Sequence, residues 1–439
     1  MRLSSVAGSS SPGLPWIDVL GRSAVAAIRP GPFAVLDVGT TKACCLVARG
    51  RPDGELDVLG AGLQYAAGLR AGEVVDAQAV EASVLAVVQE AEQRSGETLR
   101  EVLLAVNTGL PTSRHVTIEV GLGRRPVTEA DMRRALEQAQ AEVRAEGLEA
   151  LHALPVDISV DGGRRLRDPR GLIGERLVVG VHLICVGATP LQNLIACVER
   201  CHLEVARVVA APYASGIASL SADEAELGAL LLDMGGGVTG IAVFAGGRLR
   251  HLDVVPIGGQ HITQDLAYGL STGLAHAERI KNLYGSVLRR AGDERRRLEV
   301  PLVGDHDGAA SHVVPRSRLA EIIQPRMEEV FQLVLDRLAA APALPQGTQL
   351  VLTGGVSQLE GVAELAEEMF GLPARLARPQ QGHAAAAAGL GDQGSAVTAA
   401  GVLALAVGGD GGLAYRVPRP APLFGARLAR LGRWLRENF

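Results

Sequence analysis

Two stretches of the chain share one order of apolar and polar residues. Residues 35–41 read VLDVGTT and residues 231–237 read LLDMGGG, 196 positions later. In each stretch an apolar run leads to an aspartate and a glycine-containing corner, and a second apolar run and another turn follow. This order predicts a β-hairpin with a carboxylate near its tip. A third extended stretch and then helical periodicity come next, so we predict a repeated βββα unit.

The segment between the two copies has a pattern of its own. Residues 99–188 contain strand-like runs at 102–107, 115–120, 156–160 and 176–186 and a helical pattern at 127–146. The helix opens with Thr128 and, three residues later, Asp131, a capping box in which Asp replaces Glu. We therefore predict an inserted α+β subdomain. Helical patterns at 261–284 and 319–338 predict that the second half also carries a lobe of its own.

Composition narrows the class of protein. The chain has 439 residues, 47% of them hydrophobic and 21% charged, which indicates a globular protein of about three domains. Its 54 glycines and 3% aromatic residues favour an α/β architecture with tight turns. The net charge of −5, from 43 basic and 48 acidic residues, gives no global electrostatic reason to bind nucleic acid. We read the basic run at 294–297 as a solvated face.

The cysteines and the hydropathy of the chain indicate the cellular compartment in which the protein works. Five cysteines form neither an even disulfide framework nor a Cys-x-x-Cys pair, which favours a reducing compartment, the cytoplasm. No apolar run reaches the ~18 residues of a membrane-spanning helix, and the longest candidate lies at 396–407. We expect no membrane crossing. The first 30 residues lack the pattern of a signal peptide and are predicted to be a flexible extension.

The repeated hairpins predict a phosphate site. Backbone N–H groups at a glycine corner can cradle phosphates, and Asp37 and Asp233 can hold Mg²⁺ through its waters. One Asp-x-Gly alone is more often an ordinary turn. The duplication at matching positions favours the phosphate site.

Two further elements fit a nucleoside. An apolar strand at 350–353 ends in Gly354 and Gly355, where a flat base or ribose can lie against the backbone; the alternative is a βα turn that merely needs glycine. Glu278 and Lys281 stand three residues apart on one predicted helix face and can reach the nucleoside. Their alternative is a surface ion pair. No other catalytic or metal-ligand cluster is readable, and we expect His182 to be packed or hydrogen-bonded.

These motifs carry a resemblance. In their order along the chain, residues 37–42, 212–216, 233–237, 278–281 and 352–355 resemble the phosphate-1, connecting, phosphate-2 and adenosine motifs of the actin/Hsp70/sugar-kinase superfamily. Within that superfamily the chain resembles the bacterial cell-division FtsA proteins. The specific points are the inserted segment after the first helix, the run RHLDVVP at 250–256 and the C-terminal helix described below. The resemblance covers residues 33–439.

The resemblance implies an α/β, two-lobed actin-like (ribonuclease H-like) fold that binds ATP with Mg²⁺. The residues it assigns to ATP are Asp37, Gly39, Thr40, Thr41, Lys42, Asp233, Gly235, Gly236, Gly237, Thr239, Glu278, Lys281, Gly354 and Gly355, with the metal at Asp37 and Asp233. Val238 and Gly240 stand where a hydroxyl and a polar side chain are common, which leaves Thr239 as the only hydroxyl of the second corner. The resemblance therefore implies ATP binding with weak or absent hydrolysis and no catalytic residue.

The resemblance also divides the chain into subdomains. The expected parts are an extension (1–30), subdomain IA (31–98, 189–209 and 383–412), the SHS2-like insertion IC (99–188), IIA (210–264 and 349–382), IIB (265–348), a linker (413–422) and a terminal helix (423–439).

The terminal helix is predicted from its own periodicity. At about 100° per residue its apolar residues form one stripe and its arginines lie opposite, a pattern typical of helices that insert into an anionic membrane surface. The residues assigned to the membrane are Phe424, Leu428, Leu431, Trp434, Leu435, Phe439, Arg430 and Arg433. The alternative is a helix that docks on its own domain or on a partner.

The partners expected from the resemblance are the FtsZ C-terminal peptide, bound on the lobe formed by residues 267–338, further copies of the chain in an actin-like protofilament, other divisome proteins and the anionic membrane. The implied place is the cytoplasmic face of the inner membrane at the septum, as a peripheral protein.

Two alternatives remain open: a small-molecule kinase of the same superfamily, and another actin-like scaffold such as a pilus-assembly protein. A kinase needs a general base beside an acceptor pocket, and the loops after the two aspartates offer no obvious one.

Overall fold

The repeated unit is present in both halves of the computed structural model, which describes residues 31–51, 56–303, 311–378 and 394–407. The first copy is β1 (Pro32–Val38), β2 (Lys42–Gly50), β3 (Leu56–Tyr65) and α1 (Ala77–Ser95); the second is β11 (Ala229–Met234), β12 (Thr239–Ala245), β13 (Arg248–Val255) and α6 (Gly259–Gly269). Asp37 pairs with Cys44 and Asp233 with Gly240, so each aspartate stands one residue before the end of its strand. The predicted βββα repeat is confirmed.

Each hairpin belongs to a five-stranded sheet. The first sheet has the order β10-β6-β1-β2-β3, with β6 at Glu101–Val106 and β10 at Glu204–Ala210. The second has the order β13-β12-β11-β16-β17, with β16 at Gln349–Thr353 and β17 at Ala374–Leu376. In both sheets the aspartate-bearing strand pairs antiparallel with the next strand on one side and parallel with a later strand on the other.

One strand lies elsewhere than predicted. The run at 102–107 was assigned to the insertion, but β6 pairs parallel with both β1 and β10 in the first sheet, and the assignment is wrong. The reason is burial: residues 102–106 are all buried, as expected for a strand covered on both faces of a parallel sheet.

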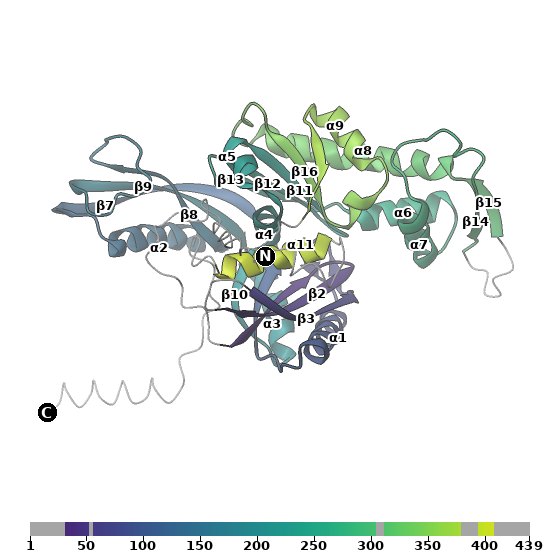
Figure 1. The fold of residues 1–439 in the computed structure, drawn as a ribbon, viewed down its shortest axis with the longest axis horizontal. Helices are drawn as coiled ribbons and strands as arrows, with labels where there is room; N and C mark the ends of the chain where they lie inside the picture. Colours follow the sequence, from purple (N-terminus) through teal and green to yellow (C-terminus); the bar gives the residue numbers. More distant parts are fainter. Residues whose placement is uncertain (1–30, 52–55, 304–310, 379–393, 408–439) are drawn as a thin grey trace, which may run out of the picture.

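The insertion begins after β6. It is a three-stranded sheet of β7 (Thr112–Pro126), β9 (Ile173–Gly187) and β8 (Leu148–Val160) with α2 (Glu129–Ala145) packed against it and a core of its own. This subdomain projects from the two sheets at one end of the molecule (Figure 1). The Thr128 N–H donates to the Asp131 carboxylate at 2.9 Å, so the predicted reach of Asp131 back to the helix start is confirmed.

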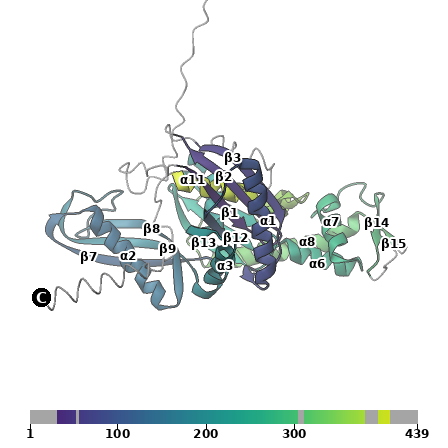
Figure 2. The same ribbon diagram turned by 90° about the horizontal axis from the view of Figure 1, so that it is seen from below.

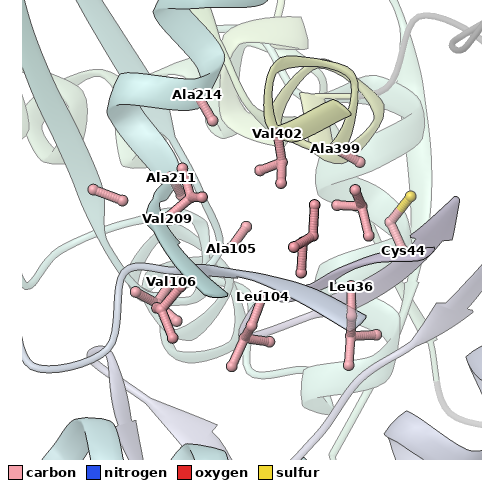
Figure 3. Packing of buried hydrophobic residues seen from close by; sticks show 14 of the residues in the cluster. Leu36, Cys44, Leu104, Ala105, Val106, Val209, Ala211, Ala214, Ala399 and Val402 are labelled. Atoms are coloured by element: carbon pink, nitrogen blue, oxygen red, sulfur yellow. The ribbon is translucent and has the colours of Figure 1, made fainter. Parts of the chain in front are cut away.

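Two helices lie between the sheets (Figure 1). The buried helix α4 (Ala211–Ser219) packs on the second sheet, and α11 (Gly394–Val407) packs on α4 and on the first sheet. Figure 3 shows Ala399 and Val402 of α11 above Leu36, Cys44 and Leu104 of the first sheet. No helix in the described part of the chain is both long enough and apolar enough to cross a membrane.

The remaining elements complete the two lobes. Helices α1 and α3 (Ala188–Arg200) cover the outer face of the first sheet, on the side away from α11 (Figure 2). The second lobe adds α7 (Leu274–Tyr284), α8 (Ser317–Ala339), α9 (Val362–Phe370), the 3₁₀ turn η1 (Gly355–Gln358) and the hairpin β14 (Arg297–Pro301) with β15 (Ser311–Pro315). Short pieces are β4 (Leu69–Arg70), β5 (Glu73–Val74) and α5 (Ala222–Leu227). The extension 1–30, the linker 413–422 and the helix 423–439 lie outside the described residues.

Candidate functional site

The two hairpin corners open into one cleft between the lobes. Its volume is about 390 Å³. Most of the predicted nucleotide residues line it: Asp37, Gly39, Thr40, Thr41, Lys42, Asp233, Gly235, Gly236, Glu278, Lys281, Gly354 and Gly355. Segments more than 300 residues apart in the sequence are thus brought together on one cavity.

Two of the predicted residues do not line the cleft. The Thr239 hydroxyl donates to the Ile257 carbonyl at 2.9 Å and is buried, so this placement contradicts its assignment to the nucleotide. A Cβ on Gly237 would stand 2.5 Å from Thr40 Oγ1, so this glycine allows the two corners to approach each other. The absence of a side chain at Gly240 also has a packing reason, since a Cβ there would lie 2.4 Å from Pro212 of α4.

The two aspartates form the electrostatic centre of the cleft. Burial, and then the charge of Asp233, raises the pKa of Asp37 to about 8. Burial raises the pKa of Asp233 to about 6, against a hydrogen bond that Ser215 Oγ donates at 3.0 Å. Ser215 also lies 2.9 Å from the Thr398 hydroxyl of α11. Two buried carboxylates that resist ionisation together are a place where a cation is stabilised.

The aspartate pair fits a magnesium ion that keeps part of its water shell. No group of three potential His, Cys, Asp or Glu ligands exists among the described residues. Mg²⁺ commonly keeps several waters and takes one or two carboxylates together with ligand phosphates. The cleft offers that set: two carboxylates, and beside them the glycine corners at 39 and 235–236.

The opposite wall comes from α7. The Lys281 ammonium donates to Glu278 Oε2 at 2.6 Å, to Thr263 Oγ1 at 2.8 Å and to the Gly259 carbonyl at 3.1 Å. An ammonium has three donors, so all three are used within the protein. Burial, opposed by the Glu278 carboxylate, lowers the pKa of Lys281. Lys281 therefore orients Glu278. The Oε1 atom of Glu278 accepts from Asn282 at 3.2 Å, and its side chain is 37% exposed.

The third wall is the turn after β16. Gly354 has φ +88°, and a Cβ on it would stand 2.4 Å from the Met234 carbonyl, so its glycine identity follows from backbone conformation and close approach. Gly355 is different. A Cβ there would meet no protein atom within 4 Å, although the residue lines the cleft. The space above Gly355 is open to a ligand.

Among the cleft residues that sequence reasoning missed are two polar residues at the end of β6. Asn107 and Thr108 follow β6 and line the cleft beside Asp37. Asn107 Oδ1 is buried and has no hydrogen-bond partner within the described residues. A buried acceptor without a donor is costly, and a ligand or its water would satisfy it. The signal was available: the carboxyl ends of parallel strands share one edge, so assigning β6 to the first sheet would have placed both residues next to Asp37.

The chain is similar to known cell-division proteins over most of its length. A model of the cell division protein FtsA matches residues 230–400, and a model of the SHS2 domain inserted in FtsA matches residues 109–185. The cell division protein FtsA of Rhizobium meliloti is 37% identical over 448 residues, covering 99% of this chain and all of that protein. The chain belongs to the FtsA family. It is a cell-division protein.

Other FtsA proteins support the same membership. That of Agrobacterium fabrum is 36% identical over 98% of this chain and 99% of its own length, and that of Escherichia coli K12 is 32% identical over 78% and 83%. The FtsA membership does not favour the kinase alternative. The matched SHS2 segment, 109–185, agrees with the structural insertion from β7 to β9.

Solved structures confirm the actin-like fold. A chain of the PilM–PilN type IV pilus biogenesis complex superposes with a TM-score of 0.58 at 16% identity, covering 85% of this chain and 98% of that one. MreB5 of Spiroplasma citri, bound to ADP, gives a TM-score of 0.51 at 14% identity, covering 85% and 95%. At these identities the likeness concerns the fold alone.

The aspartate pair predicts a pH dependence in the protein free of metal and nucleotide. Burial and the charge of Asp233 raise the pKa of Asp37 in the folded protein from 3.8 to about 8. Its contribution to stability is therefore complete below pH 4 and is lost as the pH rises through 8. Asp37→Asn removes the charge and should raise the melting temperature in EDTA at pH 8 by about 2–4 °C.

The check is a series of thermal melts from pH 6 to 8.5. The parent should lose stability with rising pH, and Asp37→Asn should flatten that loss. Asp336→Asn, at an exposed carboxylate on α8, is the control and should follow the parent. A slope in Asp37→Asn as steep as that of the parent would contradict the assignment.

Proposed function

We propose that this protein binds ATP with Mg²⁺ in the cleft and tethers FtsZ filaments to the cytoplasmic membrane. The observation that carries the nucleotide part is the pair of duplicated aspartate corners that meet in one cavity. The MreB5 neighbour is bound to ADP, which is consistent with this proposal.

In this proposal each wall of the cleft has one task. Asp37 and Asp233 hold the hydrated metal, and the backbone N–H groups of the two corners bind the phosphates. Glu278 accepts a hydrogen bond from the ribose through Oε1, which also accepts from Asn282, and the base lies against Gly354 and Gly355. The metal supplies charge neutralisation for the phosphates when it is bound.

Slow or absent hydrolysis belongs to the same proposal. The cleft-lining carboxylates among the described residues are Asp37, Asp233 and Glu278. The first two are engaged with the metal in this proposal, and Glu278 pairs with Lys281 at 2.6 Å. None of these three remains as a general base for water or for an acceptor substrate, which also weighs against a small-molecule kinase.

The tethering role rests on the family and on the C-terminal sequence. We infer that the lobe formed by residues 267–338 receives the FtsZ C-terminal peptide. We also infer that residues 423–439 bind the anionic inner membrane at the septum, so that the protein is peripheral on the cytoplasmic face. The inserted subdomain, which lines no part of the described cleft, is proposed as a contact module for further copies of the chain and for later division proteins.

Gly355 provides a clean test of the nucleoside site. Gly355→Val adds a branched side chain at a position where a Cβ meets no protein atom within 4 Å. The variant should therefore fold while its ATP affinity falls by about tenfold or more, equivalent to ~1.4 kcal/mol. Gly121→Val is the control, because a Cβ at this exposed strand position also meets nothing within 4 Å. An ATP-induced rise in melting temperature that is equal in the parent and in Gly355→Val would refute the base site.

A vesicle flotation assay tests the tether. A fluorescent FtsZ C-terminal peptide should float with anionic vesicles only when the full-length protein is present. Trp434→Glu should leave both protein and peptide unbound at any salt concentration, since it places a carboxylate at the edge of the apolar stripe. Changing Arg430 and Arg433 to Gln should weaken binding mainly to anionic vesicles, and less at high salt. If Trp434→Glu floats as well as the parent does, the terminal helix is not the anchor.

A further inference from the structure

One arginine outside the cleft joins two of its walls. Arg316 stands directly before α8, and its side chain is only 8% exposed. Its Nε donates to the Tyr284 carbonyl at 3.0 Å, its Nη1 to Asp293 Oδ1 at 2.9 Å, and its Nη2 to the Glu360 carboxylate. The guanidinium thus binds three separate segments at once.

Two of these segments carry the nucleoside walls. Tyr284 is the last residue of α7, whose Glu278, Lys281 and Asn282 line the cleft. Glu360 follows η1, and this turn and its preceding glycine supply the other wall. Arg316, Asp293 and Glu360 are not among the residues that line the cleft.

The same two segments are also joined through the backbone. Val287 N–H donates to the Glu360 carbonyl at 2.7 Å. This bond fixes the two segments at one point, where Arg290 Nε also lies 3.5 Å from Glu360 Oε1. The rigid fork of Arg316 adds a further charged connection on the Tyr284 side. An arginine fork holds its partners in a defined plane, whereas a lysine is a point charge on a flexible stem.

We propose that Arg316 is a positioning residue that sets the separation of α7 and η1 and thereby the affinity for the nucleoside part of the ligand. The inference rests on the proposed nucleotide function. Arg316 should affect only the nucleoside end of the ligand, because its hydrogen bonds go to Tyr284, Asp293 and Glu360. The phosphate corners lie on the hairpins β1–β2 and β11–β12, and their hydrogen bonds run within the hairpins and to α4 and α6.

The test compares Mg²⁺·ATP with Mg²⁺·tripolyphosphate, which lacks the nucleoside, by calorimetric titration of the full-length protein. In Arg316→Lys the ratio of ATP affinity to tripolyphosphate affinity should fall about tenfold. This is the effect of losing one charge-assisted hydrogen bond. Tripolyphosphate affinity should stay within about twofold of the parent. A role in general stability alone would weaken both ligands together.

Arg326→Lys is the matched control. Arg326 lies on α8, the helix that Arg316 precedes, and its fork binds Asp265 of α6 at 2.6 and 2.9 Å rather than Tyr284 or Glu360. The affinity ratio of Arg326→Lys should therefore equal that of the parent. Glu360→Gln, at a side chain that is 46% exposed and also lies 3.5 Å from Arg290, should shift the ratio in the same direction as Arg316→Lys. It tests the positioning role if Arg316→Lys does not fold.

Three outcomes overturn the inference. An unchanged ratio in the folded Arg316→Lys and Glu360→Gln variants removes the positioning role, and so does an equal fall in Arg326→Lys. A parent that binds neither ligand refutes the proposed function itself, a result distinct from the other two.

Discussion

The free-energy cost of ionising two buried carboxylates side by side is the constraint on which the rest of this structure depends. Asp37 and Asp233 stand at equivalent positions in two copies of one hairpin and share one cleft, where burial raises the pKa of both. Asp233 accepts a hydrogen bond from the neutral hydroxyl of Ser215. A divalent cation held by these carboxylates, as we propose, would lower this cost and would favour a phosphate ligand beside them.

The rest of the fold brings the two corners together. Small residues allow the approach: Gly236 and Gly237 lie against Thr41 and Thr40, where a Cβ would come within 2.7 and 2.5 Å. Behind the corners, α4 and α11 fill the space between the sheets with short side chains. The hydrogen-bonded chain from Asp233 through Ser215 to Thr398 ties the last described helix to the site.

The sequence predicted the parts that depend on local pattern. The duplicated hairpins, the capped helix of the insertion and the glycine turn after β16 follow from periodicity and turn chemistry, and the structure has them. The neighbours of each strand are a tertiary property. For that reason the apolar run at β6 was read as a strand but placed in the wrong sheet, and Asn107 was missed with it.

The direction in which side chains point was also not predictable from the sequence pattern. Thr239 was assigned to the ligand as the only hydroxyl of its corner, yet alternation along β12 turns it toward Ile257. Lys281 was expected to reach the nucleoside, but its three donors are used by Gly259, Thr263 and Glu278. Spacing in the sequence placed both residues near the cleft, and only the packing around them shows which atoms they bind.

The central claim is that a cation held by the aspartate pair binds ATP in this cleft, and calorimetric titration of ATP tests it most directly. In the parent, ATP affinity should be at least about tenfold higher with Mg²⁺ than with EDTA. In Asp37→Asn this metal effect should largely disappear. Equal ATP affinity with and without Mg²⁺ in the parent, or an undiminished metal effect in Asp37→Asn, would contradict the account.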